Sequence, residues 1–236
     1  DEPIVTHFMN AISLCIPESE RFLVRAMKPY VLNNNSAELT KSLEGFIDDE
    51  HSHSLHHTKF NQDLKRHHYP VHFALKFSKF GFNCIDKLFS KKTKVAIAVC
   101  FEHMTSVIAT TGFEHELMKE DVSKIYDLFI WHAFEELNHR SVANDLYLSL
   151  GGGYLRRVLS MFYVTFFFIT GVSIIQLRFI FSDLVARRGI QCKHWCYAFK
   201  FFFGKKGLIR GSMRHYLSIY AYKFTIEQCF KGVWIC

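Results

Sequence analysis

Residues that interrupt helices are scarce in this sequence, which contains four prolines and twelve glycines among 236 residues. Proline removes a helical hydrogen bond and glycine weakens a helix, so their scarcity permits long helices. No run of alternating apolar and polar residues is long enough to demand a sheet. Apolar residues make up 49% of the chain, which is enough to build a full core. We therefore expect an all-α protein.

The same breakers, together with the apolar spacing, indicate where individual helices begin and end. Pro17 suits the first turn of a helix, and Asn35 with Glu38 resembles a capping box at the start of another. The glycines at 151–153 suit a helix end. We expect helices over about residues 17–27, 38–66, 93–110 and 121–150, with a loosely amphipathic stretch over about 71–89.

The second of these helices carries several potential metal ligands on one side. Glu50 and His53 are three residues apart, and His57 lies one further turn along. Side chains three and four positions apart project from the same side of a helix. These three side chains can therefore point into one cavity.

The fourth helix repeats the arrangement. Glu136 and His139 are three residues apart, and His132 and Glu135 fall on the same side. Glu135 is an alternative to Glu136, because it lies four residues before His139. One Glu-x-x-His is common by chance, but two of them on separate helices are much harder to obtain accidentally.

Two isolated acids complete the pattern. Glu20 lies on the first helix, and Glu102 lies on the third among apolar residues, where an unpaired carboxylate would be costly. Four successive helices thus carry Glu, Glu-x-x-His, Glu and Glu-x-x-His, the ligand plan of ferritin-like di-iron and di-manganese bundles. We predict a ferritin-like four-helix bundle core with additional hydrophobic C-terminal helices. Its predicted metal ligands are Glu20, Glu50, His53, Glu102, Glu136 and His139.

Three further polar residues on these helices are candidates for catalysis. We predict that Glu135, His57 and His132 add ligation or transfer protons, with polar core positions as the alternative for the two histidines. Carboxylate and imidazole ligands without thiolate argue against structural zinc. We expect two metal ions, with iron favoured over manganese or zinc.

The second half of the chain is hydrophobic and basic. Residues 158–177 contain no charged residue and are about long enough to span a bilayer. The alternatives are shallow membrane contact, or a helix buried in the protein or under a partner subunit. We expect a metal-binding helical bundle over 1–150 and a hydrophobic, basic helical extension over 151–236, packed on the bundle or on a membrane.

Charge and cysteine content narrow the cellular setting. The net charge is +7, but the basic residues are scattered and no nucleic-acid motif accompanies them, so we expect no nucleic-acid partner. The seven cysteines and the absence of a signal-peptide pattern at the start indicate free thiols in a reducing compartment. We expect a cytoplasmic protein, either free or associated with the inner membrane, and a homodimer is one candidate assembly.

Four segments contain the predicted ligands and catalytic residues, namely Pro17 to Arg25, Phe46 to Asn61, Phe101 to Ala109 and Trp131 to Tyr147. In these segments the sequence resembles a bacterial family catalogued as predicted metal-dependent hydrolases. The resemblance spans roughly the first 150 residues, is most specific in the last segment and extends to the opening residues 6–13. Asp49 stands where the family usually has Gln. The resemblance implies a metal and an enzyme more securely than it implies hydrolysis.

Three functions follow as hypotheses. In the first, two irons activate O2 to oxidise a small apolar organic substrate. In the second, a metal-bound hydroxide hydrolyses an ester, amide or phosphoester. In the third, the protein handles iron or adheres to membranes without turning over a substrate. The ligand types favour the first, and the family resemblance favours the second.

Overall fold

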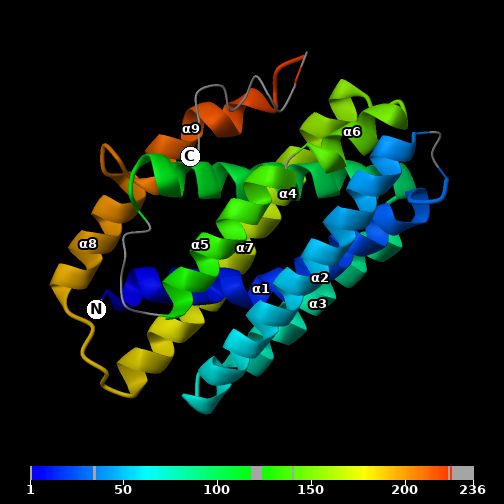
Figure 1. The fold of residues 1–236 in the computed structure, drawn as a ribbon. Helices are drawn as coiled ribbons and strands as arrows, with labels where there is room; N and C mark the ends of the chain where they lie inside the picture. The colour runs from blue at the N-terminus through cyan, green and yellow to red at the C-terminus, as the bar shows by residue number, and fades with distance from the viewer. Residues whose placement is uncertain (1, 34–35, 118–123, 140, 223, 225–236) are drawn as a thin grey trace.

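The computed structural model describes residues 2–33, 36–117, 124–139, 141–222 and 224, with only the backbone described at 124–125 and 138–139. Every regular element in these residues is a helix, which confirms the all-α prediction. Figure 1 shows their arrangement. They are α1 (Pro3–Met27), the short 3-10 helix η1 (Lys28–Tyr30), α2 (Ala37–Arg66), α3 (Val71–Leu88), α4 (Lys91–Glu114), α5 (Lys124–His139), α6 (Val142–Ser149), α7 (Tyr154–Val185), α8 (Cys192–Phe203) and α9 (Leu208–Ser218).

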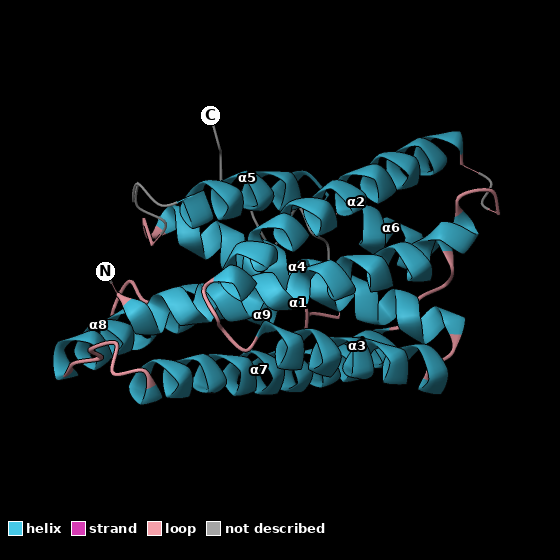
Figure 2. Ribbon diagram, turned by 90° about the horizontal axis from the view of Figure 1, so that it is seen from below, coloured by secondary structure: helices cyan, strands magenta, loops and turns pink. Residues whose placement is uncertain are grey.

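The helices form layers. Figure 2 shows α3 and α7 along one side of the molecule and α2 and α5 along the opposite side, with α1 and α4 between them. The largest core cluster joins Phe22 and Phe101 to Met161 and Val164. This core therefore contains residues from both sides of position 150, while the division into domains at that position stays a prediction.

The first helix differs from the sequence prediction, because α1 begins at Pro3 and contains Pro17 in its interior. A proline at this position cannot donate a hydrogen bond to the carbonyl of Ser13, four residues earlier. The Asn61 Nδ2 of α2 donates to that carbonyl instead, at 2.9 Å. A side chain from the neighbouring helix thus replaces the missing helical bond, and α1 continues through the proline.

The expected fourth helix is also different, since it is divided into α5 and α6. Its expected start at Asp121 lies outside the described residues. Gly151, with a φ of 65°, follows α6 in the left-handed conformation that favours glycine.

The starts of α2 and α4 depend on serine caps. The Ser36 Oγ accepts a hydrogen bond from the Leu39 backbone, and the Ser90 Oγ accepts one from the Thr93 backbone. Asn35, the expected capping residue of α2, lies outside the described residues. Gly112 lies within α4 and does not end it.

Among the described residues, two helices are long and apolar enough to cross a membrane, by length and composition alone. The most apolar stretch of α4 is 89% buried, as expected for a core helix. That of α7 is only 33% buried, because one side of α7 packs on the bundle and the other is exposed.

Candidate metal centre

Four helices bring buried acids and imidazoles to one place in the centre of the protein. On α2 and α5 the two side chains of a pair are three or four residues apart, which explains why both face inward. Each side chain is at most 5% exposed. The set comprises Glu20 from α1, Glu50 and His53 from α2, Glu102 from α4, and His132 and Glu136 from α5.

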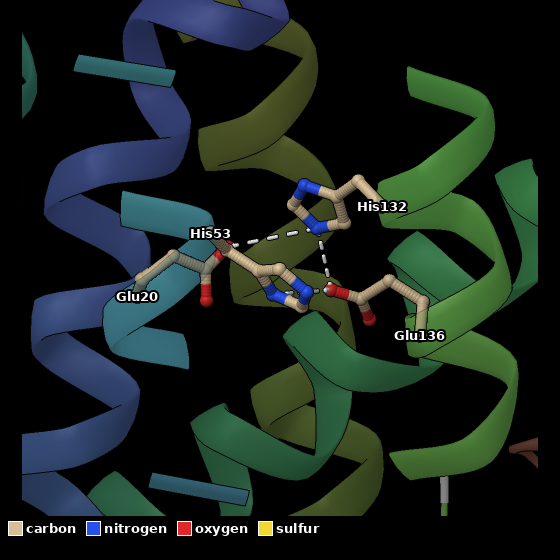
Figure 3. A group of neighbouring side chains, drawn as sticks. All are labelled: Glu20, His53, His132 and Glu136. Carbon is tan, nitrogen blue, oxygen red and sulfur yellow. Dashed lines mark hydrogen bonds and ion pairs between the residues drawn. The ribbon is translucent and has the colours of Figure 1, made fainter. Parts of the chain in front are cut away.

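These side chains form two overlapping groups, each with the geometry to hold a metal ion. In both groups the potential ligand atoms lie within 4.8 Å of one another. Figure 3 shows the first group, in which His132 and Glu136 of α5 face Glu20 and His53. The second group consists of Glu50, Glu102 and Glu136. Since Glu136 belongs to both, it is placed to bridge two ions.

The imidazole nitrogens of His53 and His132 lie within 4.0 Å of several carboxylate oxygens. The His53 Nε2 lies 2.7 Å from the Glu135 Oε2, and its Nδ1 lies 3.7 Å from the Glu50 Oε2 and 4.0 Å from the Glu136 Oε1. The His132 Nε2 lies 2.7 Å from the Glu136 Oε1 and 4.0 Å from the Glu20 Oε1. Both imidazoles therefore join carboxylates from different helices.

A chain of hydrogen bonds fixes where the protons of two histidines lie. Because Asn61 donates its amide to the Ser13 carbonyl, its Oδ1 faces the Ser13 hydroxyl and accepts from it at 2.9 Å. The Ser13 Oγ, having used its only proton, accepts from the His57 Nδ1 at 2.9 Å. The Nε2 of a neutral His57 then accepts a hydrogen bond from the protonated His132 Nδ1, at 2.9 Å.

This chain leaves the His132 Nε2 with a lone pair directed at the Glu136 Oε1, 2.7 Å away. A nitrogen lone pair and a carboxylate oxygen repel each other at this distance unless a cation is bound to both of them. That cation is either a proton or a metal ion. The orientation of His132 thus suits a metal ligand held in one tautomer by a hydrogen bond behind it.

Several carboxylate oxygens in the cluster also fit a metal. The Glu20 Oε2 and both oxygens of Glu102 are buried without a hydrogen-bond partner among the described residues. Such atoms cost free energy unless something else satisfies them. Hard oxygen donors beside neutral imidazoles are suitable ligands for iron, manganese or zinc. The residues present therefore fit a divalent metal.

The pKa shifts reflect burial and crowding of charge. Burial raises the pKa of Glu102 well above its usual value, and the charges of Glu136 and Glu50 raise it further. Burial would also raise the pKa of Glu136, but hydrogen bonds from His132 and Thr105 and the nearby imidazoles hold it at about 2.

The histidines shift in opposite directions. Burial would lower the pKa of His53, but the nearby carboxylates of Glu50, Glu136 and Glu135 raise it to about 9. Burial lowers the pKa of His57 well below its usual value, and the neighbouring imidazoles lower it further. His57 is therefore neutral, as the hydrogen-bond chain requires.

The structure brings together five of the six predicted ligands, namely Glu20, Glu50, His53, Glu102 and Glu136. The side chain of the sixth, His139, lies outside the described residues. Among the predicted catalytic residues, His132 lies within the cluster and His57 stands directly behind it. Glu135 lies at the edge, where its side chain is 31% exposed and contacts His53.

Sequence reasoning missed several residues that position the cluster. The Thr105 hydroxyl donates to the Glu136 Oε2 at 2.6 Å, and the Trp131 Nε1 donates to the Glu135 Oε1 at 3.1 Å. Ser13 and Asn61 orient His57. The only available signal was helical spacing, because Trp131 and Glu135 are four residues apart and Thr105 is three from Glu102.

An apolar cavity adjoins the cluster between α1, α3, α4, α5 and α7. His132, Glu136 and Thr105 form its polar end. The part of the cavity that can hold the centres of water molecules has a volume of about 100 Å³. All the empty space between the lining atoms, including the part open to solvent, is about 950 Å³. The remaining lining is almost entirely apolar, and includes Met9, Ile12, Phe77, Phe82, Phe101, Phe129, Phe167 and Phe168.

Comparison with known proteins agrees with this site. A family described as predicted metal-dependent hydrolase matches residues 1–228, which extends the resemblance well beyond the first 150 residues. No curated protein and no solved structure matches the chain. Since the match covers nearly the whole sequence, including every member of the buried cluster, the chain belongs to the predicted metal-dependent hydrolase family.

Proposed function

We propose that this protein is a two-metal enzyme that uses O2 to oxidise an apolar substrate held in the cavity. The observation that carries the proposal is the carboxylate-rich cluster shared through Glu136 and opening onto an apolar chamber. One glutamate from each of two helices, with glutamate and histidine from two others, is the plan used by di-iron and di-manganese bundles.

The charge of the cluster supports two ions. Its four buried carboxylates, Glu20, Glu50, Glu102 and Glu136, carry four negative charges when ionised, which equals the charge of two divalent cations. Buried charge is tolerated only when it is balanced. One divalent ion would leave an excess of negative charge that protons would have to neutralise.

When bound, iron or manganese would supply the capacity to activate O2 and to change oxidation state. The chain's own residues have other tasks. His57 and Ser13 hold His132 in one tautomer. Thr105 fixes the second oxygen of Glu136. The half-buried Glu135, hydrogen-bonded to His53, is placed to pass protons between the buried cluster and solvent.

The cavity supports an apolar substrate. It reaches His132 and Glu136 at one end and is otherwise lined mainly by aliphatic and aromatic side chains. An apolar lining excludes water and favours substrates without charge. O2, which is itself apolar, would enter such a chamber readily.

Hydrolysis is the second candidate, because the family description names it. In this case the metal would lower the pKa of a water molecule and polarise the scissile carbonyl or phosphoryl group. Glu135, at the solvent edge, would exchange the protons. An apolar ester or amide would fit the same cavity.

Metal substitution distinguishes the two candidates. The protein is purified with chelator, loaded separately with Fe2+ and Zn2+ under anaerobic conditions, and exposed to air with apolar esters or hydrocarbons. We expect O2 consumption and an oxidised product with iron only, in a single turnover for which the two Fe2+ ions supply the two electrons that hydroxylation by O2 requires. Full turnover with zinc, without O2 consumption, would replace oxidation by hydrolysis. A Glu136→Gln variant, which removes the shared carboxylate charge, should lose both metal loading and turnover.

A further inference from the structure

The outer side of α7 is an exposed apolar surface along its whole length. Most of its exposed apolar residues recur every three or four positions, so they lie on one side of the helix. Phe162 and Phe166 are 60% and 72% exposed. Monomeric soluble proteins rarely expose an apolar surface of this extent. The stripe comprises Leu155, Leu159, Phe162, Phe166, Ile169, Ile174, Leu177, Phe181, Leu184 and Val185.

Neighbouring helices extend this surface. On α3, Phe73 and Phe80 are exposed, and the Arg178 guanidinium of α7 lies over the Phe73 ring at 5.9 Å. At the other end, Ile180 of α7 and Ala198 of α8 belong to one core cluster with Ile4 and Val5 of α1. The exposed residues of α8 include Trp195, Phe199 and Phe203. Figure 2 shows α3, α7 and α8 along the same side of the molecule. We call this surface the α3–α7–α8 face.

The charges around the face are almost all positive. Between Leu146 and Phe224 the sequence contains a single acidic residue, Asp183, which is buried and paired with His7. On α3, the acid Asp86 is partly buried and pairs with Arg25. On α3, α7, α8 and the segments that follow α7 and α8, the exposed basic residues are Lys76, Lys79, Lys87, Arg156, Arg178, Arg187, Arg188, Lys193, Lys200, Lys205 and Lys206.

We propose that the α3–α7–α8 face docks on an anionic lipid membrane, with α7 lying in the plane of the interface. Apolar side chains would enter the boundary between headgroups and acyl chains, while the surrounding lysines and arginines would bind lipid phosphates. A second copy of the chain fits this face less well, because two such cationic surfaces would repel each other.

The packing of α7 argues for lying on the membrane and against crossing it. Its inner side buries Arg157 and Asp183 against the rest of the protein. The Arg157 guanidinium donates to the carbonyls of Ile219 and Ala221. On the opposite side of the molecule, α2 exposes charged residues, including Lys41 and Glu44. Among the described residues, the α3–α7–α8 face is therefore suited to lipid and the α2 side is not.

The apolar cavity lies directly inside this face. Phe77 of α3 and Phe167, Phe168 and Gly171 of α7 line it. An ideal Cβ on Gly171 would lie 3.6 Å from the Phe77 ring, so the two helices approach closely at this point. Docking would bring the outer wall of the cavity against the lipid, which suits a substrate dissolved in a membrane. The docking itself does not require the metal.

Vesicle sedimentation tests the proposal with the full chain. Binding is measured to phosphatidylcholine vesicles and to vesicles of equal parts phosphatidylcholine and phosphatidylglycerol, at low and high salt. We expect binding to the anionic vesicles that weakens with salt. Leu159→Ser, at a position 59% exposed on α7, should lower the partition coefficient about fivefold to twentyfold, because insertion would bury only the exposed part of this leucine.

The matched control is Leu55→Ser on α2, where the leucine is 53% exposed on the opposite side. It should change the partition coefficient by less than about twofold, since surface changes outside the contact have small effects. Thermal melts of both variants check folding, and Phe166→Ser provides a second substitution on the face. Equal binding by all variants, or no preference for anionic vesicles, would overturn the proposal. So would a concentration-dependent dimer, abolished by Leu159→Ser, in a protein that ignores vesicles.

Discussion

Replacing Glu102 by methionine should stabilise the metal-free protein while destroying its response to metal. Glu102 is 1% exposed, and neither of its oxygens has a hydrogen-bond partner among the described residues. Methionine has a similar length and no polar atoms, so it fits the same space. The substitution removes a group that is unfavourable in the metal-free core and needed only when metal is bound.

The magnitude follows from the unsatisfied oxygens. Leaving a buried polar group without a partner costs about 1–3 kcal/mol. For a chain of this size that corresponds to a rise in melting temperature of roughly 2–12 °C, at about 2–4 °C per kcal/mol. The gain should depend on pH. Because the folded-state pKa of Glu102 is raised above its usual 4.5, the folded state keeps a proton that the unfolded state loses.

The free energy of unfolding should therefore fall as pH rises above 4.5 towards the folded-state pKa, by up to about 1.4 kcal/mol per pH unit. His53, whose pKa rises from 6.5 to about 9, adds a further loss between those values. Glu102→Met should remove the part of this pH dependence that comes from Glu102 and keep the part that comes from His53.

The assay is thermal unfolding, followed by circular dichroism, of chelator-treated protein with and without Mn2+ across this pH range. The control is Glu44→Met on the exposed surface of α2, which should change stability by less than about 0.5 kcal/mol and keep the metal response. If Glu102→Met lowers the melting temperature of the metal-free protein, or still gains the full stabilisation from Mn2+, the reasoning about this cluster is wrong.

Three further outcomes are expected. Ser13→Ala should weaken metal binding about 10- to 100-fold in a competition titration with a chelator, because His57, which orients His132, loses its hydrogen bond to Ser13. Ser78→Ala changes a buried serine that takes no part in these hydrogen bonds, so it should leave metal binding unchanged. Adding metal at about 1,000 times its Kd should stabilise the protein by about 4 kcal/mol, and chelator should reverse this in thermal melts. Phe77→Ala should enlarge the cavity and favour bulkier substrates at unchanged metal content, whereas Phe80→Ala, outside the cavity lining, should leave substrate preference unchanged.

Much of the buried cluster could be predicted from helical spacing alone. Glu50 and His53, or His132 and Glu136, must share a helix side whatever the rest of the fold does. The isolated acids were informative for another reason, since Glu102 lies in an apolar helix that has to be buried. All five predicted ligands with described side chains meet in one place.

Other features depended on contacts between helices and could not be read from local patterns. Pro17 is a sound signal for a helix start, but α1 passes through it because Asn61 satisfies the carbonyl that the proline leaves free. The orientation of His132 depends on the hydrogen bond that its Nδ1 donates to His57. A sequence shows that 158–177 is apolar, but only the packing of α7 on α1 and α4 shows which side is exposed.

The most direct test of the account is a crystal structure of the metal-loaded protein with anomalous scattering measured at the absorption edge of the metal. We expect two anomalous peaks, one on each side of the Glu136 carboxylate, with Glu20, Glu50, His53, Glu102 and His132 as surrounding ligands. A map without peaks at this cluster, or with metal bound only at surface residues, would contradict the central claim.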